Sequence, residues 1–488
     1  MAETCREPKV RLRLFVDEEK NKVVLAEASK DFVDVLFSLL TLPMGAIVRL
    51  LEKHRESSKP ITIGCFNNLY KSVVDMDIHN FETQASKEIL LNPRSLSEVK
   101  CRKLKLDINP TDDLKFFTCR NLCNLCSNFN TSLCKCGNLM NAEMPLSSQP
   151  RVSASLQNDA NGVFVSGRCS YIITDDLNVA VSSTSLVLNK LKSQGYVDVS
   201  KLGEKLVDVG FEEVLTLLEC IFSSNAPLTD AFLNNKESTQ DSSKIDQILS
   251  QCVEEKNGVE AEPEKVLTLS AVVRKHDMNI LYVECGEDFV DHLFSFLAVP
   301  LESVLEIFGN ISTNGCIGNL FGSFNDLSGV NERTTHKSML HHYYRCKKQL
   351  LDITTDQTPV YDCYKIPGSG LTINSDLNPV VLMDPKSNGR DQSPEGSGFV
   401  KRDTKFTVSD DLIITPMNSS STICLLKKFE IQAEDLEVQE ISITKIEATS
   451  LLRASLVTSS ALNTCLKNLI VKNSKVERLA ETRNCNSA

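Results

Sequence analysis

The chain contains one sequence pattern twice, and this internal repeat restricts its fold more than any other feature. Residues 31–43 read DFVDVLFSLLTLP, and residues 288–300 read DFVDHLFSFLAVP. Two such stretches do not match by chance within one chain, so we interpret them as equivalent parts of a duplicated unit.

Further pairs of similar stretches keep the same order along the chain, which extends the predicted duplication beyond one motif. The pairs are GCFNNLYKSV from Gly64 with GCIGNLFGSF from Gly315, CRKLKLDI from Cys101 with CKKQLLDI from Cys346, FVSGRCSYIITDDL from Phe164 with FVKRDTKFTVSDDL from Phe399, and LLECIFSSNAPL from Leu217 with LLRASLVTSSAL from Leu451. We therefore predict two diverged copies of one unit in tandem.

The length of the chain agrees with this division. A single core stops growing at roughly 250 to 300 residues, and the chain has 488, so we expect two or more cores. A stretch rich in Asn, Ser, Lys, Asp and Glu separates the copies, as a linker would. The predicted segments are a first repeat unit at 1–233 with halves 10–145 and 160–233, a linker at 234–263, a second repeat unit at 264–475 with halves 266–384 and 398–475, and a tail at 476–488.

Within each copy, the spacing of apolar residues predicts a β-hairpin followed by helices. Apolar residues alternate from Val10 to Val16, as in a half-buried strand, and a polar turn before Val23 leads into a second short strand. From Phe32 to Leu40 they recur at helical spacing, and Pro43 is expected to end this helix and open the next. A strand and a helix follow in the second half of each unit. The predicted fold class is α+β.

Five cysteines in the stretch CRNLCNLCSNFNTSLCKCG are the candidate metal ligands. They are Cys119, Cys123, Cys126, Cys134 and Cys136. Cys123 and Cys126 have the spacing of a zinc knuckle, whereas Cys134 and Cys136 are one residue closer than usual. Two interpretations remain open. Four thiolates would hold a structural zinc ion with no open position, or the segment is a cysteine-rich loop of free thiols.

Paired aspartates follow the predicted strands of both second halves, Asp175 with Asp176 and Asp410 with Asp411. Aspartate commonly ends a strand or caps a turn through hydrogen bonds between its side chain and the backbone. We therefore interpret these pairs as turn residues. The same reasoning leads us to expect that Asp34 and Asp291 lie on solvated faces of their helices.

Composition argues against several classes of protein. A formal net charge of -11 disfavours a nucleic-acid partner, because binding to phosphates needs clustered Lys and Arg. The longest apolar run, 32–51, contains charged residues and a proline, so we expect no membrane span. The start of the chain, MAETCREPKV, lacks the apolar core of a secretory signal, so we expect an intracellular protein of the cytoplasm or nucleus with reduced thiols.

A resemblance to a known family rests mainly on the first copy. The stretches are FVDEEKNKVVLAEASKDFVDVLFSLLTLPMGAIVRLL, CKCGNLMNAE, the TDDL turn and EEVLTLLECIFSSNAPLTDAFL. Together they closely resemble the plant family called domain of unknown function 674. The second copy lacks the CKCG element and the PLTD ending. The resemblance implies a plant protein of tandem units, and no activity or catalytic residue comes with it.

These observations favour a non-catalytic interaction or regulatory protein with an unidentified protein partner, because no P-loop, GxGxxG or GxSxG motif is present. One rival hypothesis is an enzyme with a cleft between the copies, which would use carboxylates such as Asp175 or Asp410. Another is a redox or metal-handling protein that uses thiols of the cysteine cluster.

Overall fold

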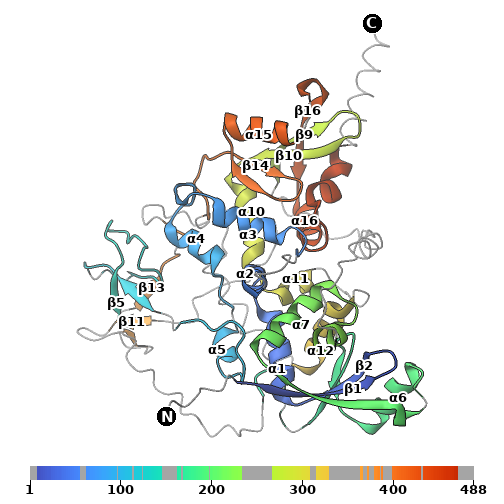
Figure 1. Ribbon diagram of the computed structural model, residues 1–488. Coiled ribbons are helices and arrows are strands. Elements are labelled where there is room, and N and C mark those ends of the chain that lie inside the picture. Colours follow the sequence, from blue (N-terminus) through green and yellow to red (C-terminus); the bar gives the residue numbers. More distant parts are fainter. Residues whose placement is uncertain are drawn as a thin grey trace, which may run out of the picture.

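The computed structural model has two five-stranded antiparallel sheets at opposite ends of the molecule, with most helices between them (Figure 1). The predicted α+β class is thereby confirmed. The structure describes residues 8–54, 62–95, 97–112, 115–121, 123, 125–144, 162–165, 167, 169–196, 198–233, 266–307, 315–328, 363–365, 371–372, 379–384, 386–387, 398–429 and 432–470. The predicted linker at 234–263 and tail at 476–488 lie outside these residues.

The first sheet combines strands from both halves of the first predicted unit. Its strands are β1 (Val10–Asp17), β2 (Lys22–Ala28), β6 (Tyr171–Thr174), β7 (Val179–Val181) and β8 (Leu202–Val209), in the order β7-β6-β2-β1-β8. β1 and β2 form the predicted hairpin, in which Leu14 lies opposite Ala26. Val10, Leu12 and Leu14 are buried and alternate with exposed arginines, because this face of the sheet packs on the helices.

The second sheet has an equivalent strand order, built from the later part of the chain. Its strands are β9 (Leu267–Arg274), β10 (Asn279–Cys285), β14 (Phe406–Ser409), β15 (Ile414–Pro416) and β16 (Leu436–Ile443), in the order β15-β14-β10-β9-β16. The sequence stretches that match each other thus supply strands at equivalent positions of the two sheets.

Helices connect the strands in a similar order in both parts of the chain. The helices are α1 (Lys30–Ser38), η1 (Leu39–Thr41), α2 (Met44–His54), α3 (Phe66–Asp75), η2 (Ile78–Asn80), α4 (Gln84–Leu91), α5 (Glu98–Cys101), α6 (Thr184–Ser193), η3 (Val199–Lys201), α7 (Phe211–Ser223), α8 (Pro227–Phe232), α10 (Glu287–Ala298), α11 (Leu301–Ile307), α12 (Gly315–Leu327), α15 (Ser419–Phe429), η6 (Ala433–Asp435), α16 (Lys445–Val457) and a helix at 461–470. As expected from the sequence, Pro43 separates one helical segment from the next.

The third long helix of each unit packs against the sheet of the other unit. α3 lies on β15, where the Ser72 hydroxyl oxygen accepts the Ile414 N–H at 2.9 Å. In the reciprocal contact, α12 lies on β7, where the Ser323 hydroxyl oxygen accepts the Val179 N–H at 2.9 Å. The two serines occupy the same place in the matching GC stretches.

A shared asparagine supports each of these crossed contacts. The Asn68 side-chain amide donates to the Asp411 carbonyl at 2.8 Å. The Asn319 amide donates to the Asp176 carbonyl at 2.9 Å. The matching residues of the two GC stretches therefore make equivalent contacts.

The two units also meet at their equivalent prolines. Pro43 forms an isolated antiparallel bridge with Pro300. Two backbone bonds of 3.0 Å flank this bridge, from the Met44 N–H to the Val299 carbonyl and from the Leu301 N–H to the Leu42 carbonyl. Each segment thus contacts its own equivalent, as in an isologous interface between two subunits.

The main hydrophobic core is common to both units. One contiguous cluster of buried apolar side chains includes residues of both. Phe37 of α1 meets Phe324 of α12 edge to face at 5.3 Å between ring centroids, and Phe81 stacks on Phe294 of α10 at 6.2 Å. α3 and α12 contribute to this core by burying their apolar faces across the junction.

The expectation that Asp34 lies on a solvated helix face is wrong. Asp34 is only 3% exposed. The carboxylate accepts the backbone N–H groups of Val163, Phe164 and Val165 at 2.7, 2.8 and 3.1 Å. These bonds fasten the segment before β6 to α1, while burial raises the pKa of Asp34.

Asp291 of α10 is buried in the equivalent way, so the expectation for this residue is also wrong. It is 2% exposed and accepts the N–H groups of Phe399 and Val400 at 2.7 and 3.0 Å. Burial raises the pKa of Asp291 to about 7. Helical spacing assigned both aspartates to solvent because it does not reveal a later segment that covers the helix.

One position of α10 buries an ionisable group where α1 has an apolar side chain. His292 is 3% exposed and follows Asp291 as Val35 follows Asp34. Its ring contacts Phe296, and its buried Nε2 atom has no hydrogen-bond partner among the described residues. Burial lowers the pKa of His292 to about 4.

The close contact between α3 and α16 predicts a difference between two equivalent glycines. Gly64 has a φ of 49°, and a Cβ there would lie 2.2 Å from the Ser455 carbonyl oxygen. Gly315 has a φ of 66°, but a Cβ there would have no neighbour within 4 Å among the described residues. Gly64→Ala should lower the free energy of unfolding by about 1 to 3 kcal/mol more than Gly315→Ala, in denaturant titrations of both variants. Equal losses would contradict the packing of α3 on α16.

The burial of His292 predicts that His292→Val stabilises the protein, increasingly so in acid. Below the ordinary histidine pKa of 6.5, the His292 imidazole of the unfolded chain binds a proton. In the folded wild type the same imidazole stays neutral down to about pH 4. Acid therefore favours unfolding of the wild type through this residue. Urea titrations at pH 7.5 and pH 5 should show a larger gain at pH 5. The reciprocal variant Val35→His should show the opposite trend, and a gain independent of pH would contradict the prediction.

Candidate metal centre

The candidate metal ligands lie in a small β-lobe to one side of the helices that separate the two large sheets (Figure 1). The first unit supplies β3 (Phe116–Thr118), β4 (Leu125–Cys126) and β5 (Ala142–Met144), and the second supplies β11 (Cys363–Lys365), β12 (Leu371–Thr372) and β13 (Pro379–Leu382). β3 pairs with β5, and the other strands form a sheet in the order β12-β11-β13-β4. The lobe therefore combines strands from distant parts of the chain.

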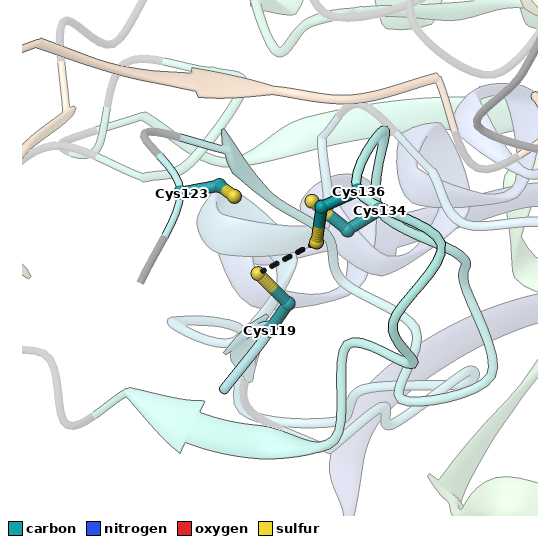
Figure 2. Close-up of side chains that lie close together, drawn as sticks. All are labelled: Cys119, Cys123, Cys134 and Cys136. Atoms are coloured by element: carbon teal, nitrogen blue, oxygen red, sulfur yellow. Dashed lines mark hydrogen bonds between the residues drawn. The ribbon is translucent and has the colours of Figure 1, made fainter. Parts of the chain in front are cut away.

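Four of the five predicted ligands converge. Figure 2 shows the sulfur atoms of Cys119, Cys123, Cys134 and Cys136 turned toward one another. All four sulfurs lie within 4.8 Å of one another. The Cys119 and Cys136 sulfurs are 3.7 Å apart. A tetrahedron of sulfurs around zinc, with bonds of about 2.3 Å, has edges of about 3.8 Å. The cluster can thus hold a metal ion after small side-chain movements.

The CKCG element brings two of these sulfurs together through a tight turn. The Gly137 N–H donates to the Cys134 carbonyl at 2.8 Å, and the Cys134 N–H donates to the Asn138 carbonyl at 2.9 Å. Gly137 has a φ of 82°, a left-handed conformation that glycine adopts without steric cost. The turn accounts for the short spacing of Cys134 and Cys136, which the sequence marked as atypical of a zinc knuckle.

The structure does not bring Cys126 into the cluster. This residue is buried in β4, and its carbonyl accepts the Met383 N–H at 2.8 Å. Cys123 is instead grouped with Cys119, four residues earlier. The structure therefore separates the two members of the Cys-x-x-Cys pair, because β4 begins between them and places Cys126 in the sheet.

The thiols of the cluster differ in acidity. A hydrogen bond from the Asn138 backbone lowers the pKa of Cys136 to about 6, and this residue is exposed. Hydrogen bonding with Cys119 and the other cluster thiols raises the pKa of Cys123 to about 12, while burial raises that of Cys134. Because zinc binds the thiolate form of cysteine, binding of a metal to this cluster would release protons.

Among the residues that the structure describes, few apolar side chains pack around the cluster. Cys119 and Cys134 are buried together with Met140 and Met383, and Phe117 and Leu125 pack at the edge. This described part of the core buries little apolar area, and the ligands themselves form part of it. A bound metal would therefore contribute much of the stability of this lobe.

The aspartates of the enzyme hypothesis serve as helix caps. Asp175 accepts the Thr229 N–H at 2.9 Å and the Thr229 hydroxyl at 2.7 Å, which caps α8. Asp410 accepts the Asn463 N–H at 2.8 Å and the hydroxyl of Ser460 in the equivalent place. Burial raises the pKa of Asp175. The interpretation as structural residues agrees with these contacts, although they reach beyond the local turn.

Sequence reasoning missed one buried charge next to the lobe. Lys386 is 0% exposed, and its ammonium group lies 3.1 Å from both carboxylate oxygens of Asp384. It also lies 5.5 Å from the centroid of the Phe399 ring. The surrounding sequence is rich in Pro, Gly, Ser and charged residues, so no local pattern marked this lysine as buried.

Comparisons with known proteins identify a family and nothing closer. Within the described part of the chain, no helix is both long and apolar enough to cross a membrane. Searches among curated proteins and among solved structures found no match. Residues 6–446 match the family described as Protein of unknown function (DUF674). Because this match covers most of the sequence, as its motifs suggested, the chain belongs to the DUF674 family.

Proposed function

We propose that this protein is a non-catalytic interaction or regulatory protein whose β-lobe is held together by one structural zinc ion. The observation that carries the proposal is the convergence of four cysteine sulfurs within 4.8 Å. Four protein ligands complete the tetrahedral shell that zinc prefers and leave no position for water or substrate. The metal would then act on the fold and not on a reaction.

The donor set favours zinc over the hard cations. Thiolates bind soft or borderline metals, whereas calcium and magnesium select oxygen ligands. Cys136 already has a lowered pKa, so one thiolate is ready to bind at neutral pH. Reduced thiols suit the cytoplasm or nucleus, which we propose as the compartment of this protein.

The contacts of Asp175 and Asp410 support a non-catalytic role. Asp175 and Asp410 each accept one backbone N–H and one hydroxyl from a helix or the segment that leads into it. These contacts stabilise the fold, so neither carboxylate is placed by its geometry as an acid or base. Two large sheets held in one arrangement and a zinc-stabilised lobe support the binding of a protein partner better than they support catalysis.

The zinc proposal predicts about one zinc ion per chain in protein purified under reducing conditions. Cys134→Ser combined with Cys136→Ser should remove it, because two of the four ligands are lost. Cys126→Ser is the matched control and should retain the metal, since Cys126 lies outside the cluster. Elemental analysis of the three proteins measures this directly.

Other outcomes would redirect the proposal. Absence of zinc from the reduced wild type would exclude the metal centre, and rapid labelling of native Cys136 would then favour a thiol redox function. The interaction role is tested by isolating the protein under native conditions. A stoichiometric partner bound by the wild type and by Cys126→Ser supports it, whereas a protein that stays free of partners contradicts it.

The caps predict a graded effect of two substitutions at Asp175. Asp175→Ala removes the acceptor for the Thr229 N–H and should lower the free energy of unfolding by about 0.5 to 2 kcal/mol. Asp175→Asn keeps a side-chain oxygen at the same place and should cost less. Thermal and urea unfolding of both variants give the comparison. A larger loss for Asp175→Asn would contradict the capping role.

A further inference from the structure

The metal cluster is connected to the second unit through the backbone of β4. β4 lies between the ligands Cys123 and Cys134 and pairs in parallel with β13, with Leu125 opposite Val381 and Cys126 opposite Leu382. The pairing involves only two residues of each strand. So short a ladder is marginal by itself and depends on what holds its strands in place.

A side chain of the second unit completes the small core behind the ligands. Met383 follows β13 directly and is 7% exposed. It is buried in the same cluster as Cys119, Cys134 and Met140, and its N–H donates to the Cys126 carbonyl at 2.8 Å. The pairing of β13 with β4 and the packing of the ligand cysteines therefore involve the same contacts.

The segment that follows Met383 leads to the junction of the two units. Lys386 is buried against Phe399, whose N–H donates to Asp291 of α10. The Phe399 carbonyl in turn accepts the Glu82 N–H of the first unit at 2.9 Å. A short run of contacts thus joins the cysteine cluster to the segments where the units meet.

From these contacts we infer that the metal centre is a clamp between the two halves of the chain. Metal bound at the four cysteines fixes β4, and β4 holds β13 and Met383 in place. Asp384, which follows Met383, pairs with the buried Lys386. The inference rests on the proposed zinc site. Metal binding and the pairing of β13 with β4 are coupled, and such coupling is reciprocal. The pairing of β13 must therefore also strengthen metal binding.

Hydrogen exchange of the intact protein tests the clamp in one direction. Zinc is removed with a chelator under reducing conditions, and exchange is followed by mass spectrometry. We expect faster exchange in peptides that cover 379–387 as well as in those that cover 119–140. Peptides from β9 and β10, which lie in the second large sheet, should keep their protection and serve as the internal control.

Zinc release from variants tests the reverse direction. Met383→Ser removes the side chain behind the ligands and should weaken zinc binding on the order of tenfold, the size typical of changes to the shell around a metal. Met417→Ser is the control, because this methionine is 39% exposed at the end of β15. The rate of zinc transfer to the coloured chelator 4-(2-pyridylazo)resorcinol compares the two variants.

The outcomes separate the clamp from the zinc site itself. If zinc binds and its removal leaves hydrogen exchange at 379–387 unchanged, the clamp is overturned while the structural zinc site stands. Equal zinc release from the two methionine variants would also overturn it. Protein without zinc in elemental analysis would overturn the site and the clamp together.

Discussion

The crossed packing of α3 and α12 is the contact on which the rest of the fold depends. Each helix covers apolar residues of the other unit, so neither sheet has a complete core without its neighbour. The backbone bridge between Pro43 and Pro300 marks the place where the two halves of the chain meet at equivalent residues. Burial of apolar surface drives this association, while the serine and asparagine bonds set its register.

Buried carboxylates hold the later segments of each unit to its first helices. Burial of an ionised group is costly unless hydrogen bonds compensate, and backbone N–H groups do so at Asp34 and Asp291. The same bonds bring the chain back toward the first hairpin, so that β6 and β14 can join their sheets. One polar contact in each unit thus links segments that are more than a hundred residues apart.

The β-lobe breaks the similarity between the two halves. The first unit supplies the cysteines, and the second supplies β13, Met383 and the buried Lys386. The described part of the lobe has a small core, and its four converging sulfurs could hold a metal ion.

The sequence by itself determined the local elements and most of the candidate ligands. Alternation from Val10 predicted β1, helical spacing from Phe32 predicted α1, and Pro43 marked the break before α2. These features follow from periods of two and of 3.6 residues, which any single segment displays. Four of the five predicted cysteines also converge, because ligands close in sequence need only a tight turn to meet.

Only the tertiary structure decided which surfaces meet. The strand order, the crossing of α3 and α12, the burial of Asp34 and Asp291 and the exclusion of Cys126 all involve partners far away in the sequence. Periodicity shows that a face is apolar or polar, but the segment that will cover it is chosen by packing of the whole chain. Distant contacts therefore fixed the arrangement that local patterns left open.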